Sequence, residues 1–320
     1  PSAGGHRPGQ AAGYQYVKIL LTGASGQLGR ELTPLLTSLG SLTRVDRDVL
    51  PGDSGMLRRD LGEPQSVRNH LDEIQPDLVV NAAAYTAVDA AEDHPETAFL
   101  VNEELPANLA GWAAAKDAFV VHYSTDYVFP GKSGRPYQED DLTAPLNVYG
   151  DSKLAGELAV TGSGCRHLVV RTSWVYSSHG NNFVLTMLRL GAERPALGIV
   201  DDQLGCPTWA RNLASASCLM LEKAMAAGSA QFDGLYHYSD GDEVSWFGFA
   251  REIFAVAKEL GLLDTLPELS AVTSAEFPQK AMRPAYSVLD VTRALKVFGI
   301  ERPGLRSSLQ QCLGDIQKLE

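Results

Sequence analysis

Short runs of apolar residues recur along the first half of the chain, and each is followed by a stretch with another spacing. The first run is Val17 to Leu21, and leucines between Leu28 and Leu39 then recur at intervals of three and four residues. Mainly apolar runs of this length are typical of strands in a parallel sheet that is covered on both faces. Further strands are predicted at 42–45, 78–81, 119–123 and 167–171. The pattern predicts an α/β fold with a Rossmann-type, doubly wound parallel sheet.

The alternation of strand and helix loosens after about residue 170. Helices are predicted over 182–190, 210–226, 245–260 and 304–319, with one more short strand at 235–238. We therefore expect a flexible N-terminal tail at 1–16 and a dinucleotide-binding Rossmann domain at 17–170. Residues 171–320 are expected to form mainly a smaller C-terminal substrate lobe, with some segments returning to the Rossmann domain.

Composition narrows the class of protein. With 320 residues the chain is long enough for two lobes, and its net charge of −12 argues against a nucleic-acid partner and against a basic membrane patch. No apolar run approaches the roughly 20 residues that a membrane span needs. The four cysteines are scattered and form no Cys-x-x-Cys pair, as expected of reduced thiols in a cytoplasmic protein.

Three glycines, Gly23, Gly26 and Gly29, lie between the first predicted strand and the helix after it. Glycines at such a turn let a pyrophosphate approach the backbone at the N-terminus of a helix. The spacing therefore predicts a dinucleotide site, and the alternative is a tight turn that only packs the helix on the strand.

Two further stretches bear on the cofactor. Asp46 and Arg47 follow the second predicted strand. A carboxylate there can accept a hydrogen bond from the ribose 2′-hydroxyl of NADH, and an arginine can hold the 2′-phosphate of NADPH. The sequence therefore does not decide between NADPH and NADH as the cofactor. Asp60 could bond an adenine edge or simply cap a helix. After the strand at 78–81, the alanines at 82–84 are small enough for a cofactor to lie against the backbone.

Tyr149 and Lys153 lie four residues apart in a predicted helix, so both side chains reach the same cleft. A tyrosine pKa is normally near ~10, and a nearby ammonium lowers it, which makes this pair a plausible general acid. Thr125 follows the predicted strand at 119–123. Its hydroxyl can donate a hydrogen bond to a substrate oxygen. The alternatives are a solvated helix face for the pair and a capping turn for Thr125.

Taken together, these motifs resemble the extended short-chain dehydrogenase/reductase family, and more closely its dTDP-4-dehydrorhamnose reductase branch. The strings that carry the resemblance are VNAAAYTAVDA at 80–90, HYSTDYVF at 122–129, TAPLNVYGDSKLAG at 143–156, RTSWVY at 171–176 and NNF at 181–183. The resemblance implies an enzyme that uses NADPH or NADH to reduce the 4-keto group of dTDP-4-dehydro-L-rhamnose, giving dTDP-L-rhamnose.

The resemblance also assigns roles to residues. It implies that Tyr149 donates the proton, that Lys153 binds the nicotinamide ribose and lowers the tyrosine pKa, and that Thr125 polarises the C4 oxygen. It places Asp126 and Trp174 against the sugar. Along the cofactor it places Gly23, Gly26, Gln27, Leu28, Gly29, Asp46, Arg47, Asp60, Leu61, Ala82, Ala83, Ala84, Tyr85, Thr86, Tyr123, Tyr149 and Lys153.

One departure from the family concerns magnesium. Glu31 matches a carboxylate that holds Mg²⁺ at a dimer contact in some relatives, but Pro195 and Ala196 stand where such relatives carry acidic residues. Because Mg²⁺ needs oxygen ligands, we expect no metal site here. A monomer or weak homodimer that binds a nucleotide sugar is expected. Two other functions remain open: a sugar-nucleotide epimerase or dehydratase, and a non-catalytic regulatory subunit that binds NADP.

Overall fold

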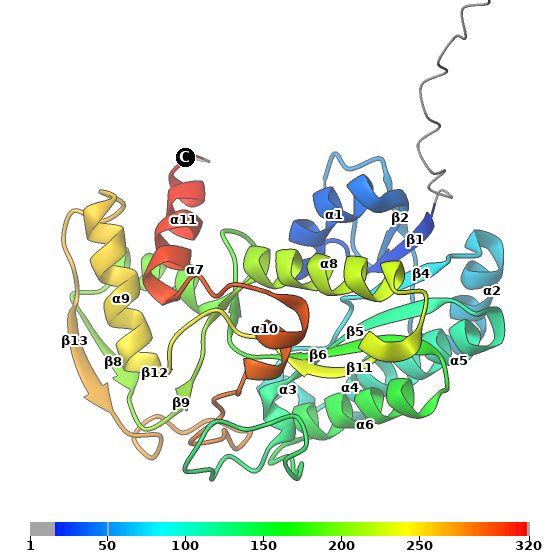
Figure 1. The fold of residues 1–320 in the computed structure, drawn as a ribbon. Coiled ribbons are helices and arrows are strands. Elements are labelled where there is room, and N and C mark those ends of the chain that lie inside the picture. The colour runs from blue at the N-terminus through cyan, green and yellow to red at the C-terminus, as the bar shows by residue number, and fades with distance from the viewer. Residues whose placement is uncertain (1–16, 50, 319–320) are drawn as a thin grey trace, which may run out of the picture.

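A parallel sheet of seven strands forms the centre of the molecule (Figure 1). The computed structural model describes residues 17–49 and 51–318, so the tail predicted at 1–16 lies outside the described residues. The strand order, β11-β6-β5-β4-β1-β2-β3, is that of a doubly wound sheet. The strands are β1 (Val17–Thr22), β2 (Gly40–Asp46), β3 (Met56–Arg58), β4 (Leu78–Asn81), β5 (Phe119–Thr125), β6 (Arg166–Thr172) and β11 (Gly234–His237).

Helices cover both faces of this sheet (Figure 1). Leu21 points to the face covered by α1 (Gln27–Leu39), α8 (Ala210–Ala226) and α10 (Thr292–Phe298). Its neighbour Leu20 points to the other face, which is covered by α2 (Pro64–Ile74), α5 (Leu105–Lys116) and α6 (Val148–Gly162). Successive side chains of a strand point to opposite faces, so burial on both sides requires an unbroken apolar run. The predicted α/β Rossmann-type fold is confirmed.

A second hydrophobic core lies beside the sheet. Figure 1 shows α9 next to the strand pair β8–β13, with α11 beside α9. Val184, Phe249, Phe254 and Leu309 are among the buried side chains of this core. Its main elements are α7 (Phe183–Glu193), β8 (Ala196–Val200), α9 (Trp246–Glu259), β13 (Glu268–Val272) and α11 (Leu305–Gln317). The chain passes between the two cores repeatedly, since α8, β11 and α10 pack in the first core.

Shorter elements join the cores to the strand ends. Two small sheets pair β7 (Val175–Tyr176) with β10 (Thr208–Trp209), and β9 (Leu204–Gly205) with β12 (Val244–Ser245). A π-helix, Leu100–Glu104, leads directly into α5. The remaining short helices are α3 (Val88–Ala91), α4 (Pro95–Phe99), η2 (Asp126–Val128) and η3 (Ala230–Phe232). Among the described residues, no helix is both long and apolar enough to cross a bilayer.

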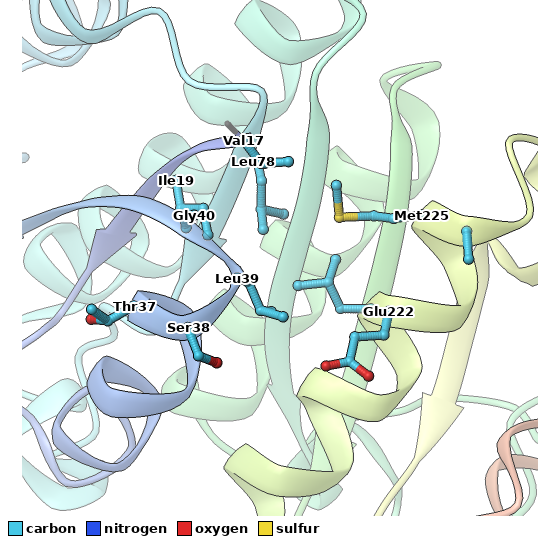
Figure 2. A pocket seen from close by; sticks show the side chains of 11 residues that line it. Val17, Ile19, Thr37, Ser38, Leu39, Gly40, Leu78, Glu222 and Met225 are labelled. Carbon is cyan, nitrogen blue, oxygen red and sulfur yellow. The ribbon is translucent and has the colours of Figure 1, made fainter. Parts of the chain in front are cut away.

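A cavity of about 840 Å³ lies at the amino-terminal edge of the sheet. Figure 2 shows Val17, Leu78, Leu39 and Met225 around it, from β1, β4, α1 and α8. The strands run parallel, so this cavity is at the edge opposite to their carboxyl ends. The predicted site residues lie at that other edge.

Candidate active site

The glycine turn between β1 and α1 is tightly packed against the end of β4. Gly23 has a φ of +68°, and a Cβ there would collide with the backbone of Ala82 and Ala83. A Cβ at Gly29 would collide with the Gly23 carbonyl. Only glycine meets both demands without strain, so the turn brings the backbone close to the crevice at the strand ends.

The N-terminus of α1 faces this turn without a side-chain cap. Gly26 is the N-cap residue and no carboxylate lies in the first turn, so the helix leaves amide donors for an anion. Leu28 packs against the first core. The Gln27 side chain faces the second core instead: Asn182 Nδ2 donates to its Oε1 over 2.8 Å. Of Gln27, therefore, the backbone is the part that can approach a pyrophosphate.

The Asp46 carboxylate is largely engaged within the protein. Its Oδ2 accepts from the backbone N–H and from the hydroxyl of Ser25, at 2.8 and 2.7 Å, and its Oδ1 accepts from the Arg47 N–H at 2.7 Å. Asp46 thereby fixes the glycine turn to the end of β2. The Arg47 side chain is 74% exposed and contacts only Asp48 among the described residues, so it is free to meet a cofactor group.

The remaining predicted cofactor residues differ in their surroundings. Asp60 is exposed and accepts a hydrogen bond from the Gly62 N–H over 2.9 Å. Leu61 packs against the buried residues between the sheet and helices α2 and α5. The alanines at 82–84 and Tyr85 follow β4 and are partly buried, and Thr86 is exposed.

A buried asparagine that the sequence analysis missed holds this loop. Asn102 accepts from the Tyr85 N–H at 2.8 Å and donates to the Tyr85 carbonyl and to Ser152 Oγ, each at 3.0 Å. It lies in the π-helix and is fully buried. The π-helix could not be predicted from apolar spacing, so nothing in the sequence pointed to this contact between the loop after β4 and α6.

Helix α6 places Tyr149 and Lys153 in the site. Asn147 caps it by accepting from the Gly150 N–H at 2.8 Å, and it also donates to the Met282 carbonyl at 2.8 Å. A Cβ at Gly150 would collide with the Tyr127 carbonyl, so α6 packs directly on the segment after β5. The Tyr149 and Tyr127 rings meet edge to face at 5.7 Å.

Burial has the largest effect on the pKa of Tyr149. Burial raises the pKa of Tyr149 to about 12, and this outweighs the Thr125 hydroxyl, which lowers it. Desolvation disfavours the phenolate more than nearby dipoles favour it. Tyr149 is therefore a neutral phenol at pH 7, with its proton in place.

Lys153 is buried and shares no hydrogen bond with Tyr149 among the described contacts. Its Nζ donates to the Tyr123 carbonyl over 2.6 Å. Burial lowers the pKa of Lys153 to about 8, although Glu157 opposes this shift. Tyr123 thus reaches the site through its backbone oxygen, because its ring packs in the first core near Ser217.

Thr125 and Asp126 lie where β5 ends, beside the Tyr149 phenol. Thr125 is 5% exposed and Asp126 is 2% exposed. The Thr125 hydroxyl donates to Asp126 Oδ1 at 3.0 Å and accepts from the Tyr127 N–H at 3.2 Å. The structure thus brings Thr125, Asp126 and Tyr149 together at the carboxyl end of the sheet.

Trp174 follows β6 in an unusual backbone conformation, with a φ of +46°. Its indole stacks on Trp246 with ring centres 3.5 Å apart and planes 4° apart, and a Cβ at Gly205 would collide with it. A left-handed non-glycine residue stores strain, which the surroundings here offset by packing. Trp246 was not singled out from the sequence, since it lies 72 residues away from Trp174 by number.

The residues around Glu31 do not fit a magnesium site. Arg211 Nε donates to Glu31 Oε2 at 2.9 Å, and its Nη1 donates to Asp315 Oδ2 at 2.5 Å. A guanidinium therefore already neutralises both carboxylates, where Mg²⁺ would need several free oxygen ligands. Among the described residues no group of three or more His, Cys, Asp or Glu side chains is arranged to hold a metal ion.

The fold and this site define the class of protein. A doubly wound parallel sheet, a glycine turn after β1, and a Tyr-x-x-x-Lys helix beside the threonine that ends β5 are the arrangement of an extended short-chain dehydrogenase/reductase. Residues 17–318 match the family described as RmlD substrate binding domain. The chain belongs to this family, the dTDP-4-dehydrorhamnose reductases.

Relatives named dTDP-4-dehydrorhamnose reductase are similar over nearly the whole chain. The one from Burkholderia thailandensis is 42% identical over 308 residues, covering 94% of this chain and 99% of the relative. The one from Escherichia coli K12 is 40% identical over 300 residues, covering 94% and 98%.

Solved structures agree with the fold. The dTDP-4-dehydrorhamnose reductase of Bacillus anthracis, solved in complex with NADP, has a TM-score of 0.82 at 33% identity and covers 94% of this chain and 100% of its own. The corresponding enzyme of Clostridium acetobutylicum has a TM-score of 0.81 at 35% identity, covering 93% of this chain and 99% of its own.

Proposed function

We propose that this protein uses NADPH or NADH to reduce the C4 keto group of dTDP-4-dehydro-L-rhamnose, giving dTDP-L-rhamnose. The observation that carries the proposal is the pair of hydroxyl groups at the end of β5. A partly buried, neutral Tyr149 phenol lies beside the Thr125 hydroxyl, in a chain that is about 40% identical to reductases of that name.

In this proposal Tyr149 gives its proton to the C4 oxygen. Its pKa of about 12 keeps the phenol protonated at neutral pH, so the proton is available when alkoxide charge develops. Thr125 donates a hydrogen bond to the same oxygen, which stabilises that charge in a site from which water is largely excluded. The nicotinamide, when bound, supplies the hydride.

Lys153 has a supporting role in the proposal. Its Nζ is fixed by the Tyr123 carbonyl, and two donors remain for the nicotinamide ribose. With a pKa of about 8, it is mostly an ammonium at pH 7 and loses its charge just above that. A positive group here also favours the phenolate that Tyr149 becomes after proton transfer.

The glycine turn and the uncapped N-terminus of α1 are proposed to hold the pyrophosphate. Arg47 is proposed to meet the 2′-phosphate of NADPH, because its side chain is exposed and is held only by an exposed ion pair with Asp48. Asp60 and Leu61, with the residues at 82–86, are proposed to line the adenosine and the rest of the cofactor. Asp126 and Trp174 are proposed to contact the sugar.

The wider organisation is also a proposal. Residues 17–170 would hold most of the cofactor site, and residues 171–320 would supply mainly the substrate lobe, with α8, β11 and α10 contributing to the sheet. A cytoplasmic monomer or weak homodimer with no nucleic-acid partner fits the net charge of −12 and the paired Glu31.

The decisive experiment follows the nicotinamide absorbance while the keto sugar nucleotide is added. A reductase consumes one reduced cofactor per sugar and yields the 4-hydroxy product, which mass spectrometry and proton NMR identify. An epimerase or dehydratase changes the sugar without net cofactor consumption, and a regulatory subunit binds cofactor and changes nothing. Either of the last two results would overturn the proposal.

A further inference from the structure

One buried carboxyl lies next to the proposed reacting groups without an ion pair. Asp126 Oδ1 is 3.0 Å from Thr125 Oγ1, and its Oδ2 makes no hydrogen bond of 3.5 Å or less among the described residues, although the Ser287 hydroxyl is near enough to lower the pKa of the carboxyl. The salt bridges described for residues 17–49 and 51–318 do not include it. A buried carboxylate with one bare oxygen is costly, whereas a neutral carboxyl in the same place costs much less.

Thr125 has one hydroxyl proton and several possible acceptors for it. The hydroxyl accepts from the Tyr127 N–H, so its own proton must point elsewhere. An ionised Asp126 can only accept, and it would take that proton. The Thr125 hydroxyl would then have nothing to donate to Tyr149 or to a substrate oxygen.

We propose that Asp126 is a positioning residue whose neutral form donates from Oδ1 to Thr125 and so turns the Thr125 proton toward the C4 oxygen of the keto sugar. The inference rests on the proposed function, because it assumes that Thr125 bonds the reacting oxygen. It goes beyond a sugar contact, since Asp126 acts here through the direction of one hydrogen bond.

The surroundings of Asp126 favour the neutral form. Burial raises the pKa of Asp126 to about 7, against the Ser287 and Thr125 hydroxyls and nearby backbone amides, which lower it. The titratable groups that face it are Tyr149 on α6, Tyr127 beside it in η2, and Cys206 ahead of β10. Burial keeps all three neutral near pH 7, since it raises the pKa of each.

The sign of the pH effect follows from this arrangement. Below about pH 7 Asp126 is neutral and Thr125 is free to donate; above it the carboxylate captures the Thr125 proton. From pH 6 to pH 8 we expect kcat/KM to fall about 20-fold, about tenfold from Asp126 and about twofold from Lys153. An ionised Asp126 would thus be an inhibitory neighbour.

Asp126→Asn tests this directly. The amide does not titrate, and its Nδ2 donates to Thr125 as a neutral carboxyl would. The measurement is the shape of the pH profile, because losing a sugar contact can lower kcat/KM of Asp126→Asn at every pH; we expect kcat/KM of the variant to fall only about twofold from pH 6 to pH 8. Thr125→Val removes the hydroxyl through which Asp126 acts. The tenfold fall in kcat/KM that we assign to Asp126 should therefore be absent in Thr125→Val, whether residue 126 is Asp or Asn. Asp72→Asn, on α2, is the matched control and should leave the wild-type profile unchanged.

A second measurement needs no substrate. The infrared spectrum of wild type minus Asp126→Asn should contain a protonated-carboxyl C=O band at pH 6 that disappears around pH 7. Absence of this band at pH 6 would overturn the inference. So would an Asp126→Asn profile that still falls 20-fold, or a variant that is inactive at every pH while it binds NADPH normally. If wild type never oxidises NADPH with the keto sugar, the proposed function fails, and the infrared band still decides the state of Asp126.

Discussion

At the scale of single residues, burial determines which groups carry protons. Tyr149 and Asp126 both have raised pKa values, and the pKa of Lys153 is lowered. The same cause acts on all three, because a low-dielectric cleft disfavours whichever form is charged. The site therefore presents a neutral phenol, a half-titrated carboxyl and a weakly basic amine near neutral pH.

Tyr149→Phe should remove most of the catalytic rate while leaving cofactor affinity nearly intact. The phenol hydroxyl is the proposed proton donor, and general acid catalysis contributes about 10²–10⁴-fold. The ring and its edge-to-face contact with Tyr127 persist in phenylalanine. Turnover is measured by nicotinamide absorbance, and affinity by cofactor fluorescence. A variant that keeps more than half of wild-type turnover would exclude Tyr149 as the donor.

Arg47→Ala should weaken NADPH binding much more than NADH binding. The Asp46 carboxylate is engaged by Ser25, so a 2′-phosphate depends on the exposed guanidinium of Arg47 for a bidentate contact. Both dissociation constants are measured by fluorescence titration at fixed salt. Arg189→Ala, at an exposed pair on α7, is the matched control. Equal losses for both cofactors would mean that Arg47 does not touch the 2′ position.

Asp126→Asn should stabilise the protein by an amount that grows with pH. The folded-state pKa of Asp126 is about 7, above its ordinary value of 3.8, so the unfolded chain loses this proton first. The contribution of Asp126 to the free energy of unfolding is therefore fully present below about pH 4. It is lost as the pH rises to about 7, and the loss is at most about 4 kcal/mol. Urea unfolding of both proteins at pH 4, 5.5 and 8 measures it. A constant difference across these pH values would contradict the shift.

At the scale of elements, the sequence predicted what depends on local pattern. The runs at 17–21 and 119–123 became β1 and β5 because both faces of the sheet are buried, and Leu32 and Leu36 face the core as their spacing predicted. The Tyr-Lys helix formed where expected, with Asn147 as its cap.

What the sequence did not predict depends on contacts between distant segments. The tie between Asp46 and Ser25 bridges β2 and the glycine turn, and the tie between Asn102 and Tyr85 depends on a π-helix. The rise that burial causes in the pKa of Tyr149 was not predicted either, because spacing along a helix contains no information about burial. Contacts between distant segments, and the pKa shifts that burial causes, exist only in the folded chain.

Asn102→Ala should destabilise the protein and weaken cofactor binding together. The substitution leaves the buried N–H of Tyr85 without its acceptor, at a cost of roughly 1–3 kcal/mol, and frees the loop after β4 from α6. Urea unfolding and NADPH titration measure the two effects. Asn108→Ala on α5 is the matched control, since that side chain is only partly buried and bonds only the Glu104 carbonyl among the described contacts. A stability loss with unchanged NADPH affinity would show that this loop does not meet the cofactor.

At the scale of the whole molecule, one guanidinium joins elements of both cores. Arg211 begins α8 and bonds Glu31 on α1 and Asp315 on α11. The Glu31 side chain is 8% exposed and that of Arg211 is 43% exposed, so the pair lies between a buried and a surface ion pair. Because a residue of the chain supplies the positive charge, the junction does not depend on a bound cation.

Arg211→Met should therefore loosen the contact between the two cores. Methionine keeps much of the apolar stem but leaves the Glu31 carboxylate unpaired, and we expect a loss of about 2 kcal/mol, between the values for exposed and buried pairs. Arg189→Met, which breaks an exposed pair on α7, should change stability by no more than about 0.5 kcal/mol. Wild type should keep its turnover and its mass by light scattering when EDTA is added. If chelation dissociates or inactivates the wild-type protein and Mg²⁺ restores it, a metal holds this junction. If Arg211→Met is as stable as Arg189→Met, Arg211 does not hold it.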